Sequence, residues 1–307
     1  MITLKFLKTT ATLAVGCVWL AGVAQAQSTW SWQMNPSTSS CTSPSPSNSY
    51  GSSSNCTSAS GGQIATVSVW SAAQGSLAEQ ANHDWHSAEL TPQGSNGFGA
   101  GNRGEGLDAN SPHHSIDNVK VNASGALEYD FMMVQFSSAV ILEQFGVGWG
   151  YNDSDATLMR WTGDAAPTTQ NSGKSLLSTI GTGAWAFVGD YSNMCKNSSG
   201  ADVSGSCDST KSRRDTGTDK ASSYWLIAAY NTTMSSLDAF SSETDDGFKV
   251  NFLKAKSYLC PAGGSATPGG NCGGSNGTPV PEPGSMALAA VAFLGLAISR
   301  RRKVLRA

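Results

Sequence analysis

The sequence predicts an all-β protein, specifically an antiparallel β-sandwich of jelly-roll type. Many short segments alternate apolar and polar residues with the period of two that is typical of strands. Turn residues, including many of the 34 glycines, separate these segments. Amphipathic periodicity of the helical kind is almost missing, which favours a sandwich over mixed folds. The predicted strands from residue 64 to residue 260 suit a single ectodomain with a substantial core.

The predicted strands follow one another at short intervals and are each bounded by turn residues. In chain order they are Ile64–Trp70, Leu127–Phe136, Val140–Leu142, Phe145–Trp149, Thr157–Trp161, Trp185–Val188, Tyr224–Tyr230 and Phe248–Phe252. The first and last of them show the clearest alternation, whereas Tyr224–Tyr230 is apolar throughout. Only Ser175–Ile180 has the pattern of a short helix within this region.

Two polar segments flank the predicted domain. Residues 27–63 are rich in Ser, Thr and Pro, so they have little apolar area to offset the entropy of ordering. Within them, Trp30 and Trp32 are expected to dock as a first strand, and the loop at Cys41 is expected to be an exposed insertion. Residues 261–279 are rich in glycine and are predicted to be a flexible linker.

The N-terminus has the features of a secretory signal peptide with an apolar helix. Lys5 and Lys8 precede an apolar stretch from Ala11 to Ala24. The triplet Ala24-Gln25-Ala26 fits the small-x-small cleavage pattern, which places the signal at residues 1–26 and the mature start at Gln27. The sequence therefore predicts export.

The charge of the exported part differs from that of the whole chain. The chain carries 19 Lys+Arg and 22 Asp+Glu. Setting aside the signal and the C-terminal 280–306 segment leaves 12 basic and 21 acidic residues, a net charge near −9. This charge argues against nucleic acid as a partner, because binding to nucleic acid needs a basic surface. It suits a soluble surface protein that attracts cations.

Six cysteines remain after Cys17 is removed with the signal peptide. An even number of cysteines in an exported chain indicates disulfides. Fifteen connectivities are formally open, and the pairing of sequence neighbours is favoured because each pair flanks a polar loop rich in Gly and Ser. This interpretation predicts the pairs Cys41–Cys56, Cys195–Cys207 and Cys260–Cys272. A zinc site is disfavoured, since no C-x2-C pair is present.

The C-terminal segment, residues 280–306, combines three parts in a fixed order. Pro281-Glu282-Pro283 is held extended by its prolines, an apolar run from Met286 to Ile298 follows, and basic residues end it. The apolar run is short for a full membrane span, and the basic cluster of Arg300, Arg301, Arg302 and Lys303 orients the tail to the cytoplasm. An uncleaved membrane anchor and a buried core helix are the alternative interpretations.

These three parts resemble the PEP-CTERM sorting domain of bacterial surface proteins that exosortase processes. The resemblance implies that Pro281, Glu282 and Pro283 are substrate residues of exosortase, and that Arg300, Arg301 and Arg302 complete the signal. It also implies a transmembrane helix in the inner membrane before processing. The protein then reaches the cell surface or extracellular matrix of a Gram-negative bacterium.

A second resemblance lies in the middle of the chain. A Gly-rich turn at residues 97–104, His114-Ser115-Ile116-Asp117-Asn118 and Asp153-Ser154-Asp155 occur in this order. The order is similar to exosortase-dependent surface proteins whose ectodomain pairs such a turn with "H-x-I-D-N" and "D-S-D" loops. This group implies no enzymatic activity that transfers to the present chain.

Catalytic motifs are weak, and no catalytic residues are predicted. Gly99, Gly101 and Gly104 match the dinucleotide pattern formally, but without the flanking strand and helix they are interpreted as turn glycines. Two histidine pairs, His83 with His86 and His113 with His114, are interpreted as surface or loop residues rather than zinc ligands. Paired carboxylates for glycoside hydrolysis stay an open alternative, because their spacing is set by the fold.

Acidic loops offer a possible calcium site. Carboxylate and amide oxygens are the ligands that calcium prefers, and five such side chains lie in predicted loops: Glu105, Asp117, Asn118, Asp153 and Asp155. The alternative is that these residues cap backbone donors in turns. No other cofactor is predicted.

The tryptophans allow two interpretations, a sugar-stacking platform or core packing. Trp149, Trp161, Trp185 and Trp225 lie in predicted strands, which favours the core. We expect a non-enzymatic protein with a structural or adhesive role in the envelope or the extracellular polysaccharide matrix. A carbohydrate-binding module and a secreted glycoside hydrolase are the alternatives.

Overall fold

The computed structural model describes residues 27–38, 40–73, 85–102, 114–118, 128–151, 154–167, 185–230, 247–260 and 265–272. The predicted signal helix, sorting helix and Ser175–Ile180 helix lie outside these residues. Across the described ranges, no helix is long and apolar enough to cross a membrane.

The described residues form an all-β domain with one turn of 3-10 helix. The elements in order are β1 (Thr29–Gln33), β2 (Ser53–Thr57), β3 (Ile64–Ala73), β4 (Trp85–Ser87), β5 (Glu89–Pro92), η1 (Gly94–Asn96), β6 (Phe98–Gly101), β7 (Ile116–Asp117), β8 (Glu128–Tyr151), β9 (Ala156–Trp161), β10 (Trp185–Tyr191), β11 (Gly205–Ser206), β12 (Arg213–Asp215), β13 (Ser222–Ala229) and β14 (Gly247–Ser257). Every pairing between these strands is antiparallel, so the predicted all-β antiparallel class is confirmed.

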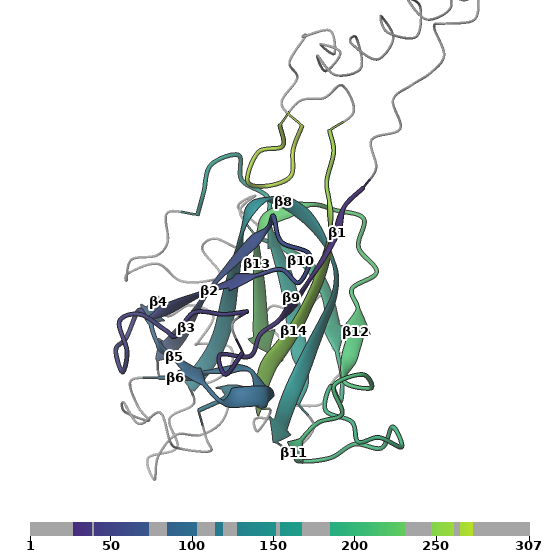
Figure 1. Ribbon diagram of the computed structural model, residues 1–307. Helices are drawn as coiled ribbons and strands as arrows, with labels where there is room; N and C mark the ends of the chain where they lie inside the picture. The colour runs from purple at the N-terminus through teal and green to yellow at the C-terminus, as the bar shows by residue number, and fades with distance from the viewer. Residues whose placement is uncertain are drawn as a thin grey trace, which may run out of the picture.

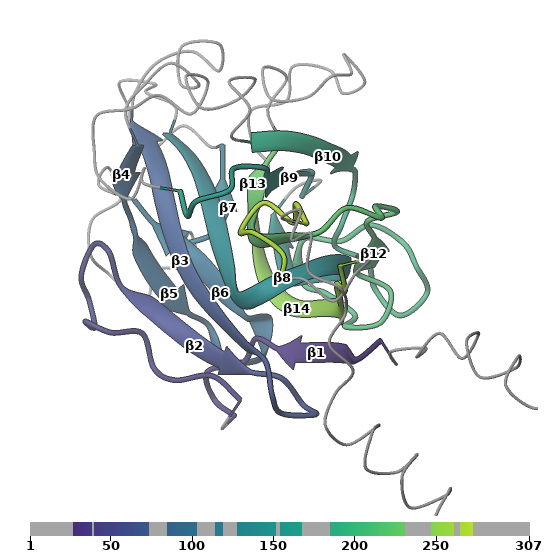
Figure 2. The same cartoon turned by 90° about the horizontal axis from the view of Figure 1, so that it is seen from above.

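Strand β8 joins the two layers of the domain. Its first half pairs with β3 and β13, and its second half pairs with β14, β12 and β11 (Figure 1). Exposed Ser137 and Ser138 lie between the halves, and the side chain of Gln63 bonds to both hydroxyls, at 2.6 and 3.1 Å. Figure 2 shows β8 leaving one layer and turning into the other.

The prediction of three separate strands between residues 127 and 149 is therefore wrong. All three are parts of the 24-residue β8. The polar residues between these segments suggested turns, but the chain stays extended through them. The pairing of β8 with β13 and β14 shifts register, and these shifts accommodate the positions where apolar and polar residues stop alternating.

Aromatic contacts connect the two layers across a shared core. The rings of Trp32 in β1 and Phe136 in the first half of β8 have centroids 5.0 Å apart. Phe145, in the second half, meets Tyr191 of β10 edge-on, also at 5.0 Å. Such ring pairs add packing energy beyond their buried area. The layers form a sandwich, and jelly-roll connectivity stays a prediction.

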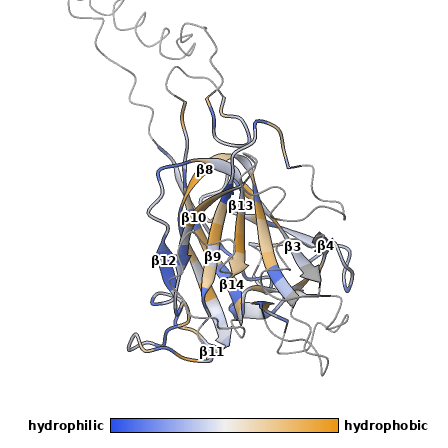
Figure 3. Cartoon of the chain, turned by 180° about the vertical axis from the view of Figure 1, so that it is seen from behind, coloured by the Kyte–Doolittle hydropathy of each residue, from blue (hydrophilic) through white to orange (hydrophobic). Residues whose placement is uncertain are grey.

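The remaining predicted strands are confirmed with small changes of boundary. Segments 64–70, 157–161, 185–188, 224–230 and 248–252 correspond to β3, β9, β10, β13 and β14. All eight residues of β13 are buried, which explains why this strand is apolar throughout. Seen from behind, β13 and β9 show hydrophobic residues along much of their length, whereas the edge strand β12 is hydrophilic (Figure 3).

The N-terminal segment is more ordered than its composition predicts. The first strand at Trp30 and Trp32 is confirmed as β1, which pairs with β14. The loop after Cys41 is largely exposed over residues 42–48, as predicted, but it is anchored at both ends, because Cys41 and Cys56 are buried and β2 pairs with β3. Hydroxyl groups supply the order that apolar area does not. Ser54 donates to the carbonyl of Thr42 at 2.7 Å, and Ser52 accepts from the amide of Leu90 at 2.8 Å.

Part of the predicted linker is also docked on the domain. Within residues 265–272, the carbonyl of Pro268 accepts a hydrogen bond from the amide of Ser223 at 2.7 Å. The side-chain amide of Asn271 donates to Asp164 at 2.9 Å. These bonds and the neighbouring disulfide fix the segment, so its glycines do not act as a free tether here.

Candidate functional site

Three disulfides join sequence neighbours. Cys41 bonds to Cys56, Cys195 to Cys207 and Cys260 to Cys272. The sequence separations are 15, 12 and 12 residues, so each bond closes a short loop. These are the pairs that adjacency predicts. They place the six mature cysteines in the arrangement expected of an oxidising compartment.

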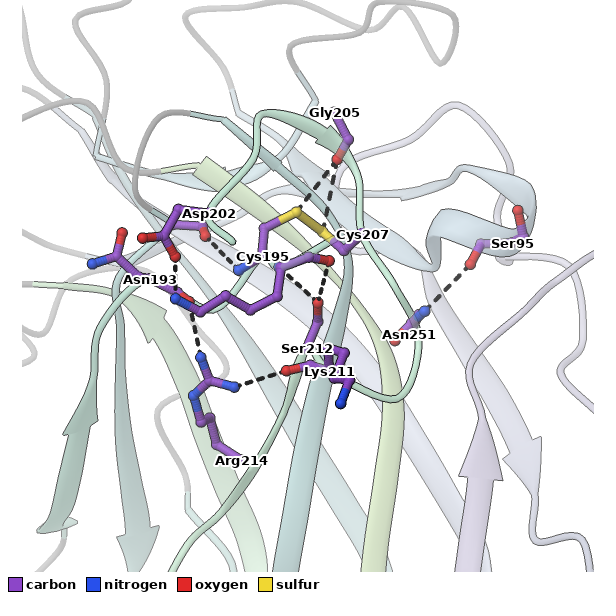
Figure 4. Close-up of a disulfide and its surroundings, with 12 residues drawn as sticks. Ser95, Asn193, Cys195, Asp202, Gly205, Cys207, Lys211, Ser212, Arg214 and Asn251 are labelled. Carbon is purple, nitrogen blue, oxygen red and sulfur yellow. Dashed lines mark hydrogen bonds and ion pairs between the residues drawn. A yellow bond between two sulfur atoms is a disulfide. The ribbon is translucent and has the colours of Figure 1, made fainter. Parts of the chain in front are cut away.

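The Cys195–Cys207 loop packs closely on the end of β8. A Cβ added to Gly150 would lie 2.5 Å from the Cβ of Cys195, so a glycine is needed at this approach. Lys196 pairs with Asp202 inside the loop, and Arg214 donates to the carbonyl of Asn193 at 2.9 Å (Figure 4). The disulfide closes the loop, the amide of Cys207 donates to the carbonyl of Gly148 in β8 at 3.0 Å, and Arg214 of β12 holds the residues just before it.

The acidic residues predicted as calcium ligands gather in part at one end of the sandwich. Asn118, after β7, donates its side-chain amide to the carbonyl of Tyr230 at 3.0 Å. The amide of Tyr230 donates to the carbonyl of Asp155 at 3.1 Å. Asp117 pairs with Gly247 in β14, as does Tyr151 of β8. Three of the five predicted ligands thus lie near the ends of neighbouring strands.

These three side chains all have hydrogen-bond partners in the fold, one of them local and two on distant segments. Asp155 accepts from the amide of Asn193 at 2.6 Å, and Asp117 accepts from the hydroxyl of Ser115 at 2.8 Å. Glu105 and Asp153 lie outside the described residues. Within the described ranges, no three His, Cys, Asp or Glu side chains are grouped so that they could hold a metal ion. The calcium site and the capping alternative both stay predictions.

A buried polar cluster at β5, β6 and β8 has no clear signal in the sequence. Glu89 and Asp130 are almost fully buried, and Asn102 donates to Asp130 at 3.4 Å. His114 is a loop residue, as one of the two interpretations has it, but it is 1% exposed and so does not lie on the surface. In the sequence, these polar residues are not distinguishable from the exposed polar positions of an alternating strand. Only the pairing of the strands shows that they are buried in the domain.

The glycines of the formal dinucleotide motif are strand residues rather than turn residues. Gly99 and Gly101 belong to β6, and Gly104 lies outside the described residues. A Cβ on Gly99 would lie 2.1 Å from the carbonyl oxygen of His114, and one on Gly101 would lie 3.2 Å from its ring. These glycines let the segment before β7 approach β6 closely.

Three of the four tryptophans considered are core residues. Trp225 is fully buried, and Trp161 and Trp185 pack edge-on with centroids 5.3 Å apart. Trp149 differs: it is half-buried and stacks on Tyr151, which is 41% exposed, at 6.4 Å with nearly parallel rings. The ammonium of Lys249 lies 4.5 Å from the Trp149 ring. The core interpretation is wrong for this tryptophan.

The outward face of the second layer carries a further aromatic and cationic group. Arg213 of β12 pairs across β8 at Gly146, which pairs in turn with Phe252 of β14. The guanidinium carbon of Arg213 lies 3.5 Å from the centre of the Phe252 ring. Gly146 permits this arrangement, because an added Cβ would lie 2.9 Å from Cγ of Arg213. The sequence carries no local signal for this group, because it depends on the register of three strands.

Fold, disulfides and an acidic surface together define a disulfide-bonded all-β domain of the kind that exported proteins carry. A match to a protein family agrees with this class and identifies a sorting motif at the C-terminal end of the chain. Residues 279–303 match the model of the PEP-CTERM protein-sorting motif. The chain therefore carries a PEP-CTERM sorting domain, which includes Pro281, Glu282 and Pro283. The motif indicates exosortase-dependent export with transient anchoring in the membrane. No curated protein and no solved structure matches the chain.

Proposed function

We propose that this chain is a surface or extracellular-matrix protein with a structural or adhesive role and no catalysis of its own. Exosortase cuts it at Pro281-Glu282-Pro283 and transfers the ectodomain to an acceptor. The match of residues 279–303 to the sorting motif is the observation that carries the proposal. The disulfide-bonded ectodomain supports it, because such a domain withstands an extracellular environment.

The order of the tail residues supports a physical route for sorting. The apolar run Met286–Ile298 halts export in the membrane, and Arg300, Arg301 and Arg302 resist transfer across it. The ectodomain then lies outside with the motif just beyond the membrane surface. Prolines on both sides of Glu282 keep the segment extended, as a peptide substrate must be.

A variant of the motif tests this route in the host cell. Glu282→Ala combined with Pro283→Ala should leave the protein in the inner-membrane fraction with its tail attached. Thr278→Ala, which lies just outside the matched residues, is the control and should be sorted like the native chain. Normal surface delivery of the motif variant would contradict the proposal.

A carbohydrate-binding module is the second candidate function. The stacked and partly exposed rings of Trp149 and Tyr151 favour it, because sugar rings bind to such aromatic faces. Titration with neutral oligosaccharides should quench or shift tryptophan fluorescence if the pair is a platform. Tyr151→Ala should then remove the change, whereas an unchanged signal in the native chain would exclude this candidate for the sugars used.

The predicted calcium site has its own test. If the acidic loops bind calcium in the native state only, millimolar calcium raises the melting temperature and EDTA lowers it. Because hydrogen bonds within the protein already engage Asp117, Asn118 and Asp155, we expect no shift in either direction. A calcium-dependent shift that disappears in Asp153→Ala would contradict the capping interpretation.

A further inference from the structure

The outward face of the second layer is built from two rows of side chains that cross four strands. One row runs from Arg213 of β12 through Gly146 of β8 and Phe252 of β14 to Gln33 of β1. The other row runs through Asp215, Gln144, Lys254 and Ser31 in the same strand order. Core residues alternate with them, since Phe145 and Leu253 are fully buried. We call the surface formed by Arg213, Lys254 and Lys256, with the buried ring of Phe252 beneath the guanidinium, the Arg213 face.

Arg213 is held in place but not neutralised. Its guanidinium lies over the ring of Phe252, a contact that orients a cation without removing its charge. Among the described residues, no carboxylate lies within ion-pair distance of it and no acceptor bonds to it; its buried Nε has no partner. Arg214, on the opposite face of the same strand, differs because it donates to the carbonyls of Lys211 and Asn193.

Two lysines extend the positive charge along β14. Lys254 and Lys256 share one carboxylate, with their ammonium groups 3.2 and 3.5 Å from the oxygens of Glu143. Their side chains are 38% and 31% exposed, so solvent reaches both. The exposed Asp215 lies at the edge of the same surface, where Gln144 bonds to it at 2.6 Å. A small excess of positive charge is left on this face of an otherwise acidic ectodomain.

We infer that the Arg213 face binds an anionic polysaccharide, with Arg213 as its main contact to an acidic group of the sugar chain. A guanidinium recognises carboxylate and sulfate oxygens with a planar fork of donors. Gln144 on β8, next to β12, and Gln33 and Ser31 on β1, at the far end of the two rows, supply amides and a hydroxyl that match sugar hydroxyl groups. This inference rests on the proposed function, which places the ectodomain in a polysaccharide matrix.

The spacing of the charges favours a polysaccharide over nucleic acid. Arg213 and Lys254 are separated by two strands, roughly 10 Å, so the face presents few and widely spaced cations. DNA carries a phosphate charge about every 1.7 Å along its axis and needs many basic contacts. A polymer with hydroxyl groups and a lower charge density than DNA fits this surface better.

The test uses the full chain in a non-ionic detergent, so that it does not depend on processing. Polygalacturonate is the anionic probe, and dextran is the neutral control polymer. We expect binding to polygalacturonate that weakens with added salt, and no binding to dextran. Arg213→Ala should weaken the affinity by about fivefold or more, as expected for loss of a charge-assisted contact.

Two further variants separate binding from folding. Lys254→Gln with Lys256→Gln changes only partly exposed side chains and should also weaken binding. Lys220→Ala removes an exposed lysine that pairs with Asp219 away from this face and should bind like the native chain. Melting temperatures of all variants show whether the fold is intact.

Several outcomes would overturn the inference. They are no binding to polygalacturonate, equal binding by Arg213→Ala and the native chain, and tighter binding to phosphatidylglycerol vesicles or duplex DNA than to the polysaccharide. If the Glu282→Ala, Pro283→Ala variant is delivered to the surface normally while the native chain binds polygalacturonate, the proposed function alone is rejected. If the sorting test gives the expected result but the native chain does not bind polygalacturonate, the inference about the Arg213 face alone is rejected.

Discussion

At the residue scale, glycines permit the closest backbone approaches in the domain. Gly97 ends η1 with φ of 96°, and an added Cβ would lie 2.0 Å from the carbonyl oxygen of Val250. The approach brings β6 onto β14, where Phe98 pairs with Val250. Both the backbone conformation and the space at residue 97 therefore require glycine.

Gly97→Ala should lower the free energy of unfolding by about 2–4 kcal/mol, because it combines left-handed strain with a backbone clash. Gly200→Ala is the matched control, since Gly200 has φ of 85° but nothing within 4 Å of an added Cβ. The control should lose only about 1 kcal/mol. Urea unfolding measures both, and equal losses in the two variants would show that the clash with Val250 is relieved.

Tyr191 gives the stability of the protein a dependence on alkaline pH. Burial, with a smaller contribution from Asp190, raises the pKa of Tyr191 from 10.0 to about 12. Its hydroxyl donates to the carbonyl of Thr216 at 3.1 Å. The folded state holds the phenolic proton more tightly than the unfolded state. The stability that this group contributes is therefore complete below pH 10 and is lost as the pH rises toward 12.

Tyr191→Phe should remove this part of the alkaline slope. At pH 7 the variant should lose about 1 kcal/mol, the usual net value of a buried hydrogen bond. Urea midpoints between about pH 9 and pH 11 should fall less steeply for the variant than for the native chain. Parallel slopes would contradict the assignment to Tyr191.

At the scale of elements, predictability from the sequence depends on whether a strand is specified by its own residues. Alternation in β3 and continuous apolar character in β13 specify those strands, and both were predicted. The polar β2, the glycine-rich β6 and the charged β12 carry no such pattern; their partners in the sheet determine them. The unbroken course of β8 was missed for a related reason, because its bend contains two serines.

The same distinction applies to the candidate sites. The disulfide pairs and the sorting motif follow from short spacings along the chain, so they could be predicted. The Arg213 face requires the register of β12, β8 and β14, which no local pattern fixes. The clustering of Asn118 and Asp155 around Tyr230 likewise depends on strands far apart in sequence.

The Cys260–Cys272 disulfide should stabilise the docked segment 265–272 rather than the whole sandwich. Cys260→Ser with Cys272→Ser should increase hydrogen exchange at the amide of Ser223, which bonds to Pro268, while amides in β3 stay protected. Removal of the Cys195–Cys207 disulfide is the comparison, because that loop packs on β8. A disulfide that closes a loop of this size contributes about 3 kcal/mol to the free energy of unfolding. Unchanged exchange at Ser223 would show that hydrogen bonds alone hold the segment.

At the scale of the whole molecule, the folded domain and the sorting motif have separate roles. The β-sandwich supplies a stable ectodomain that is fixed by three disulfides. The matched residues 279–303 supply the signal that delivers it. Exported location, negative charge and disulfide bonding are consistent with one another.

The intact mass of the protein extracted from the cell surface tests the central claim most directly. Processing by exosortase predicts a chain that begins at Gln27, carries all three disulfides and lacks Arg300–Arg302 and the residues that follow. The same measurement on the Glu282→Ala, Pro283→Ala variant should find the tail retained. Recovery of the complete tail on most native molecules at the surface would contradict sorting and establish a plain membrane anchor instead.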